Sequence, residues 1–101
     1  MWANDAAAGW ITSGEFSFDL TSKLQAATTY RIRFVGQGGG AVKVSNLVYQ
    51  QDGVEQPALI QPEPGRSDVF RLTITSIPIK AQLSGNIEGA EKGAVLIQRI
   101  G

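Results

Sequence analysis

Histidine and cysteine are both absent from this sequence of 101 residues. Without histidine the chain cannot form a Ser-His-Asp triad, a Cys-His pair or an HExxH zinc site. Without cysteine it has neither disulfides nor thiol chemistry. A metal or proton-transfer site would have to rest on carboxylates alone, and we expect no metal site and no cofactor.

An excess of charge of one sign is also lacking, since nine basic residues balance nine acidic ones. Proteins that bind nucleic acids gain much of their affinity by neutralising phosphates and usually carry a basic excess. The sequence also lacks the run of about 18 apolar residues that a membrane-spanning helix needs. We therefore expect neither nucleic acid nor a membrane as a partner.

The remaining composition is that of an ordinary globular domain, with 43% hydrophobic and 18% charged residues. A chain of this length fits one domain and can bury a core without disulfides or metal. Residues 1–101 are therefore predicted to form a single domain. Because Met1 is followed directly by Trp2, we expect that the segment was excised from a longer protein, in which Trp2 packed against a neighbour.

Apolar and polar residues alternate through most of the chain, as in Thr29–Phe34 and Phe70–Ile74. This period of two is typical of half-buried antiparallel strands. Asp52-Gly53 is a strong hairpin signal, and the glycine run Gly36–Gly40 predicts a hairpin loop. The sequence therefore predicts an all-β, two-layer antiparallel β-sandwich of about six to eight strands. A jelly-roll, galactose-binding-like topology is the first interpretation, and an Ig-like one is the alternative.

The inward positions of these runs predict the hydrophobic core. The residues expected to be buried are Phe16, Phe18, Tyr30, Ile32, Phe34, Val44, Leu72, Ile74, Ile79, Leu83 and Ile97. Ile77 and Ile79 begin one alternating run, which continues through Ala81 and Leu83, and Ala94–Ile100 forms the last one.

The strand that begins at Val42 is ambiguous, because strict alternation would bury Asn46 and expose Leu47 and Tyr49. A β-bulge at Ser45-Asn46 would reverse this arrangement. Burying an unpaired Asn46 costs about 1–3 kcal/mol. Exposing Leu47 and Tyr49 forfeits about 1.5–3 kcal/mol each. These magnitudes predict the bulge, with Leu47 and Tyr49 inward and Asn46 outward.

Catalytic chemistry is not expected. The carboxylates lie on predicted loops and outward strand positions, whereas a glycosidase needs two of them facing each other across a cleft. A small sandwich offers no deep cleft of the kind that substrates occupy. The glycine run precedes a strand and not the helix that a phosphate-binding loop requires.

The candidate binding residues are Trp10, Arg31, Arg33 and Lys43. Trp10 lies outside a clear alternating run and is either a lid on the sandwich edge or a platform on which a sugar stacks. The lid is the preferred interpretation, because Trp is usually largely buried. Arg31 and Arg33 project in the same outward direction, either as solvated surface charges or as a pair of donors that grip sugar hydroxyls.

The order of these runs resembles a known family. Thr29–Phe34, the glycine-rich loop, Val42–Gly53, Phe70-Arg71-Leu72 and Gly93–Ile97 are similar to the C-terminal β-sandwich modules of bacterial α-L-fucosidases and related glycoside hydrolases. The resemblance extends over about residues 28 to 100. The family often follows the Asp-Gly turn with an acidic-His-Gly segment, which this sequence replaces with Val54–Ile60. The role of that segment cannot be carried over, and the matched positions include no sugar-binding residue that can be assigned.

The resemblance implies a non-catalytic accessory module of a secreted glycoside hydrolase, with a structural or docking role. Its partner would be the catalytic domain of the parent enzyme, in the periplasm or outside the cell. A carbohydrate-binding module, with a glycan as partner, and an Ig-like adhesion or spacer domain are the two alternatives. A large exposed apolar patch would favour docking, whereas a polar rim around one or two rings would favour carbohydrate binding.

Overall fold

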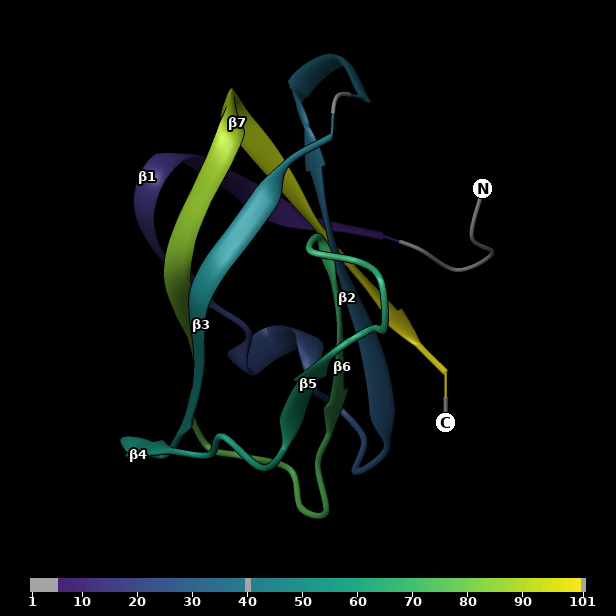
Figure 1. Ribbon diagram of the computed structural model, residues 1–101. Helices are drawn as coiled ribbons and strands as arrows, with labels where there is room; N and C mark the ends of the chain where they lie inside the picture. Colours follow the sequence, from purple (N-terminus) through teal and green to yellow (C-terminus); the bar gives the residue numbers. More distant parts are fainter. Residues whose placement is uncertain (1–5, 40, 101) are drawn as a thin grey trace.

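Antiparallel strands make up most of the chain in the computed structural model, which describes residues 6–39 and 41–100 (Figure 1). Met1 and Trp2 lie outside the described residues. The seven strands are β1 (Ala6–Asp19), β2 (Thr29–Gly36), β3 (Lys43–Gln51), β4 (Val54–Glu55), β5 (Ile60–Pro62), β6 (Val69–Thr73) and β7 (Ala81–Arg99). They form one curled sheet, so the predicted all-β antiparallel class and the predicted strand number are confirmed.

Strand β7 is the centre of this sheet. β1 pairs with one edge of β7, from Ala6 opposite Ile97 to Asp19 opposite Gln82. The other edge of β7 pairs with β3 through its first part and with β2 through its last part. The described residues contain no helix long and apolar enough to cross a membrane.

A sharp bend divides β7 into these two parts (Figure 1). Thr12 pairs with Lys92 and Gly14 with Ile87, so the four residues 88–91 of β7 lie opposite Ser13 alone. Gly89 within the bend has a φ of 105°, which disfavours residues with a side chain. A Cβ atom on Gly89 would also lie 3.0 Å from the carbonyl oxygen of Ala41. The bend therefore depends on this glycine.

Two topological predictions are corrected by this pairing. The runs after Ala81 and after Ala94 belong to one bent strand and not to two. The glycine run does not close a hairpin, because β2 and β3 pair with successive parts of the same edge of β7. The segment forms the 3₁₀ turn η2 (Gln37–Gly39), and a second such turn, η1 (Thr21–Lys23), follows β1. Alternation within a segment does not reveal which strand the segment pairs with.

The core packs inside the curled sheet around Phe34. Its ring centroid lies 5.7 Å from that of Phe16 and 6.0 Å from that of Phe70. Phe18 is partly buried against this core. The predicted core residues that are buried are Phe16, Tyr30, Ile32, Phe34, Val44, Leu72, Ile74, Leu83 and Ile97.

Ile79 is the predicted core residue for which the prediction was wrong, since it is 87% exposed. Ile77, in the same predicted run, is exposed as well. The alternation does not correspond to a strand there, because β7 begins only at Ala81. Pro78, which lies between Ile77 and Ile79, is buried in their place.

The predicted bulge is confirmed. Ser45 pairs with Asn86 and Val48 with Ser84, so two residues of β3 lie opposite Gly85 alone. Asn46 is exposed and left-handed, with a φ of 54°, whereas Tyr49 is fully buried. Leu47 packs against the core, also as predicted.

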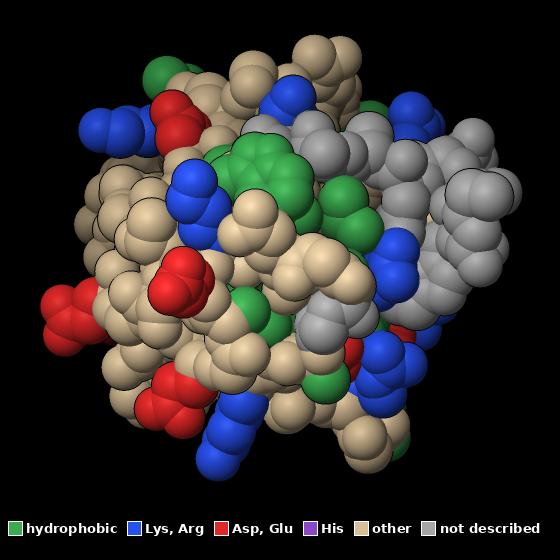
Figure 2. Space-filling model, turned by 90° about the horizontal axis from the view of Figure 1, so that it is seen from above, with side chains coloured by type: hydrophobic (Ala, Val, Ile, Leu, Met, Phe, Trp, Pro, Cys, Tyr) green, Lys and Arg blue, Asp and Glu red, His purple; other side chains and the backbone are tan. Residues whose placement is uncertain are grey.

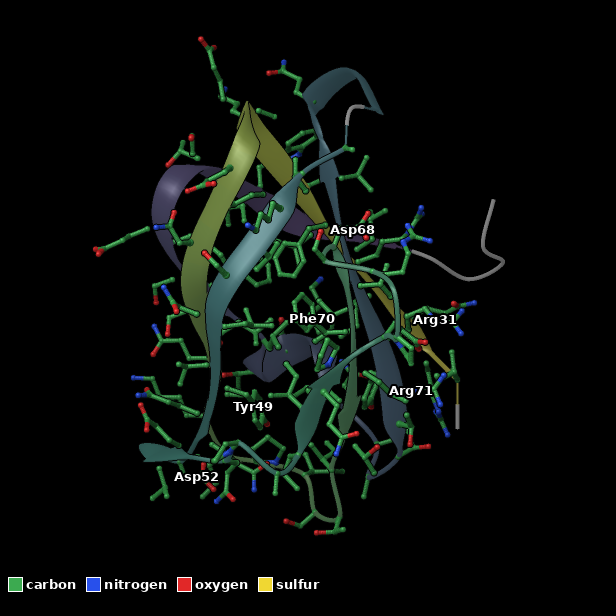
Figure 3. All side chains as sticks on the ribbon, viewed as in Figure 1. Arg31, Tyr49, Asp52, Asp68, Phe70 and Arg71 are labelled. Atoms are coloured by element: carbon green, nitrogen blue, oxygen red, sulfur yellow. The ribbon has the colours of Figure 1, made fainter. Side chains whose placement is uncertain are left out.

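Tyr49 of β3 (Figure 3) is the buried residue whose phenol pKa the core changes. Its hydroxyl donates to the side-chain oxygen of Gln51 at 3.1 Å. Burial, and then the nearby negative charge of Asp52, raise the pKa of Tyr49 to about 12. The folded state therefore retains the phenol proton at a pH at which the unfolded chain releases it.

We expect alkaline pH to destabilise the protein through this residue. The contribution of Tyr49 is fully present below its unfolded pKa of about 10 and is lost as the pH rises toward about 12. Urea unfolding across this range should show a shallower loss of stability for Tyr49→Phe than for the wild type. Equal slopes for the two proteins would contradict the prediction.

Candidate functional site

Trp10 lies within β1 and points outward. The neighbouring Ile11 takes the inward position, and Trp10 is 61% exposed. The interpretation of Trp10 as a buried lid was therefore wrong. Alternation explains the outcome, because only one of two adjacent strand residues can face the core. Trp10 pairs with Ala94 of β7, which in turn pairs with Val35 of β2.

An open hollow of about 450 Å³ adjoins the ring, and we call it the Trp10 hollow. It is lined by Trp10, Ile11 and Thr12 of β1, by Gln37 of η2 and by Lys92 of β7. η2 and the bend of β7, which Lys92 follows, lie at the same end of the molecule (Figure 1). Figure 2 looks down on this end and shows apolar side chains open to solvent beside basic and acidic ones.

The Trp10 hollow combines an exposed aromatic face with a hydroxyl, an amide and an ammonium group. Such a ring can stack on an apolar surface, while the polar groups donate and accept hydrogen bonds. Sequence reasoning did not identify Gln37 and Lys92. No local signal marks them, since Lys92 reaches Trp10 through the pairing of β1 with β7, and Gln37 through η2.

Arg31 and Arg33 point outward from β2, as predicted, but neither lines the Trp10 hollow. The Nη1 atom of Arg31 donates to the side-chain oxygen of Gln98 at 3.4 Å. Arg31 also lies opposite Arg71 of β6 and helps to line a hollow of about 290 Å³ with Glu63, Arg66 and Val69. Figure 3 shows Arg31 and Arg71 on the same side of the molecule.

Acidic residues accompany this group of arginines. Arg71 donates to Glu63 at 2.8 and 3.1 Å. Arg66 donates to both carboxylate oxygens of Asp68, at 3.1 and 3.2 Å. The hydrogen bond and charge of Asp68 raise the pKa of Arg66 above its ordinary value. These pairs make this side of the molecule a network of paired charges.

Lys43 is exposed at the start of β3, where it pairs with Glu88 of β7. It does not line the Trp10 hollow either. The structure therefore does not bring the four predicted binding residues together. Of the four, Trp10 alone lines this hollow.

A second exposed feature lies at the opposite end of the molecule, near β4 (Figures 1 and 3). Val54, Ile77 and Ile79 are 57%, 58% and 87% exposed, and we call these three residues the apolar loop end. Asp52, in the turn before β4, joins this part of the chain to the loop that carries Ile77 and Ile79. Its Oδ1 atom accepts hydrogen bonds from the backbone N–H groups of Ile79 at 2.9 Å and Lys80 at 2.8 Å.

Neither a scan against protein-family models nor a search of curated proteins finds a match for this chain. The resemblance to fucosidase accessory modules therefore stays a prediction.

We expect Asp52→Gly to loosen the apolar loop end. Glycine tolerates the positive φ of 53° at this position, so the substitution removes the acceptor without straining the backbone. Amide exchange at Ile79 and Lys80 should accelerate, and stability should fall by about 1 kcal/mol. Asp52→Asn, which keeps an acceptor oxygen, is the matched control and should retain most of the protection. Unchanged exchange in Asp52→Gly would show that the two hydrogen bonds to the Asp52 carboxylate do not hold this loop.

Proposed function

We propose that this chain is a non-catalytic accessory module whose own activity is to bind carbohydrate at the Trp10 hollow. The observation that carries the proposal is the exposed ring of Trp10 bordered by Thr12, Gln37 and Lys92. A polar rim around a single ring is the arrangement that favours carbohydrate binding over docking. Sugars present an apolar C–H face to a ring and hydroxyls to the polar groups around it.

The magnitudes predict a weak, reversible interaction. One aromatic stack contributes about 1–3 kcal/mol. Each hydrogen bond from the rim adds about 0.5–1.5 kcal/mol net. A total of about 4 kcal/mol corresponds to a dissociation constant of about 1 mM. Affinity in this range suits a module that holds a neighbouring enzyme close to its polymeric substrate.

The proposal includes a wider setting. The resemblance to accessory modules of α-L-fucosidases supports a place beside the catalytic domain of a secreted glycoside hydrolase, in the periplasm or outside the cell. The curled antiparallel sheet is compatible with the two-layer jelly roll expected of such a module. The absence of histidine and cysteine supports a role without catalysis.

We expect sugars to perturb the indole N–H signal of Trp10 in NMR titrations with neutral and acidic oligosaccharides at tens of millimolar. Trp10→Ala should weaken binding by about tenfold or more, because the stacking surface is lost. Gln61→Ala, at an exposed position of β5 outside the hollow, is the control and should bind like the wild type. Titrations that leave the Trp10 indole unmoved would contradict the proposed function.

The apolar loop end supports a second function, docking against a neighbouring domain. Three exposed aliphatic side chains lie on two segments that the hydrogen bonds of Asp52 tie together, so they form a preorganised contact. Three residues fall far short of the roughly 20–30 per side in a standard interface between separate proteins. They fit a contact between domains of one polypeptide, where the effective concentration is high.

Ile79→Ser tests this docking function. In the isolated chain the substitution should change stability by less than about 0.5 kcal/mol, because the side chain is exposed. In the chain joined to the catalytic domain of its parent protein, the substitution should separate the two unfolding transitions. The exposed Thr75 of the same loop provides the control substitution, Thr75→Ala. Unfolding of the joined protein that is insensitive to Ile79→Ser would exclude docking through this end.

A further inference from the structure

A separate hollow of about 260 Å³ lies at the β3 bulge, and we call it the bulge hollow. Its polar lining comes from three strands, with Glu15 of β1, Asn46 of β3, and Ser84 and Asn86 of β7. Phe16 and Gly85 complete the lining. It shares no residue with the Trp10 hollow.

The bulge itself builds this hollow. Glu15 pairs with Asn86, and Asn86 pairs on its other edge with Ser45, so these three residues share the outward face of the sheet. The bulge then carries Asn46 outward beside them, in the left-handed conformation. A side chain on Gly85 would meet the carbonyl oxygen of Ser45 at 3.1 Å and Cα of Leu47 at 3.3 Å. The bare glycine lets the bulge lie this close.

The polar side chains of the bulge hollow are not committed to one another. Within residues 6–39 and 41–100, none of Glu15, Asn46, Ser84 and Asn86 has a side-chain hydrogen bond or ion pair with another residue. Next to them on the same face, Gln82 donates to the hydroxyl of Ser17 at 2.5 Å. The amides and the hydroxyl of the bulge hollow are therefore available to a ligand.

The chemistry of the lining selects the ligand class. Two amides and a hydroxyl both donate and accept hydrogen bonds, and the Glu15 carboxylate accepts them. The hydroxyl groups of a sugar also donate and accept, so they match this set. An anion would be repelled by Glu15, and a calcium ion would need six to eight oxygens, usually from several carboxylates. The lining supplies one carboxylate.

We propose that the bulge hollow binds a neutral pyranose unit through Asn46, Ser84, Asn86 and the Glu15 carboxylate. The inference extends the proposed carbohydrate role to a second site, and it rests on that role for the class of ligand alone. The two hollows differ in charge. Lys92 at the Trp10 hollow accommodates an acidic sugar, whereas Glu15 at the bulge hollow disfavours one.

The test is an NMR titration of the wild-type chain with D-glucose, D-galactose, D-mannose and L-fucose, and with D-galacturonate as the charged counterpart of galactose. We expect at least one neutral sugar to shift the side-chain amide signals of Asn46 and Asn86. Galacturonate should shift them about tenfold more weakly, because of its repulsion by Glu15. Absence of these shifts with every neutral sugar would overturn the proposal, and shifts caused by calcium chloride in that case would identify a cation site in its place.

A variant then tests whether the side chain of Asn86 contacts the sugar. Asn86→Ala should weaken binding at the bulge hollow by about tenfold, the loss expected when a ligand loses its hydrogen bonds to one amide. Its backbone spectrum should otherwise match the wild type, since Asn86 is not part of the core. Gln61→Ala is again the control. Undiminished sugar-induced shifts at Asn46 in Asn86→Ala would also overturn the proposal.

The two sites can fail independently in this experiment. Shifts at Asn46 and Asn86 without movement of the Trp10 indole would reject the Trp10 site and support the bulge hollow. Movement of the Trp10 indole alone would do the opposite.

Discussion

The pairing of β7 on both of its edges is the constraint on which the rest of this structure depends. β1 follows one edge of β7 through its bend, while β3 and β2 divide the other edge between them. Because one bent strand belongs to both parts of the sheet, the angle at residues 88–91 sets how the sheet curls around Phe34. Gly89 permits that angle, since its φ of 105° and the closeness of Ala41 leave no room for a side chain.

The two hollows arise in different ways. The regular pairing of β1 with β7 places Lys92, opposite Thr12, near Trp10, and η2 adds Gln37 from the turn that follows β2. The bulge of β3, closed over Gly85, sets Asn46 beside Asn86. The bulge turns Asn46 in a direction that a regular ladder would not give it.

The exposed apolar residues, the Trp10 hollow and the paired charges lie on separate regions of the surface. The apolar loop end lies at the opposite end of the molecule from the Trp10 hollow (Figure 1). Under the proposed function, one end would contact a neighbouring domain and the other end a glycan. The arginines of β2 and β6 lie on a third surface, where Glu63 and Asp68 balance Arg71 and Arg66. That balance agrees with the zero net charge of the whole chain.

The sequence by itself determined the all-β antiparallel class, most of the core and the bulge, because alternation and the cost of burying Asn46 rather than Tyr49 are local properties. Local alternation misled at Ile79, where no strand forms, and propensity misled at Trp10, which yielded the inward position to Ile11. Only the tertiary structure decided that β7 is a single bent strand and which residues line each hollow. The physical reason is that Trp10 and Lys92, or Asn46 and Asn86, meet through strand pairings between segments far apart in the chain, and no pattern among near neighbours encodes those pairings.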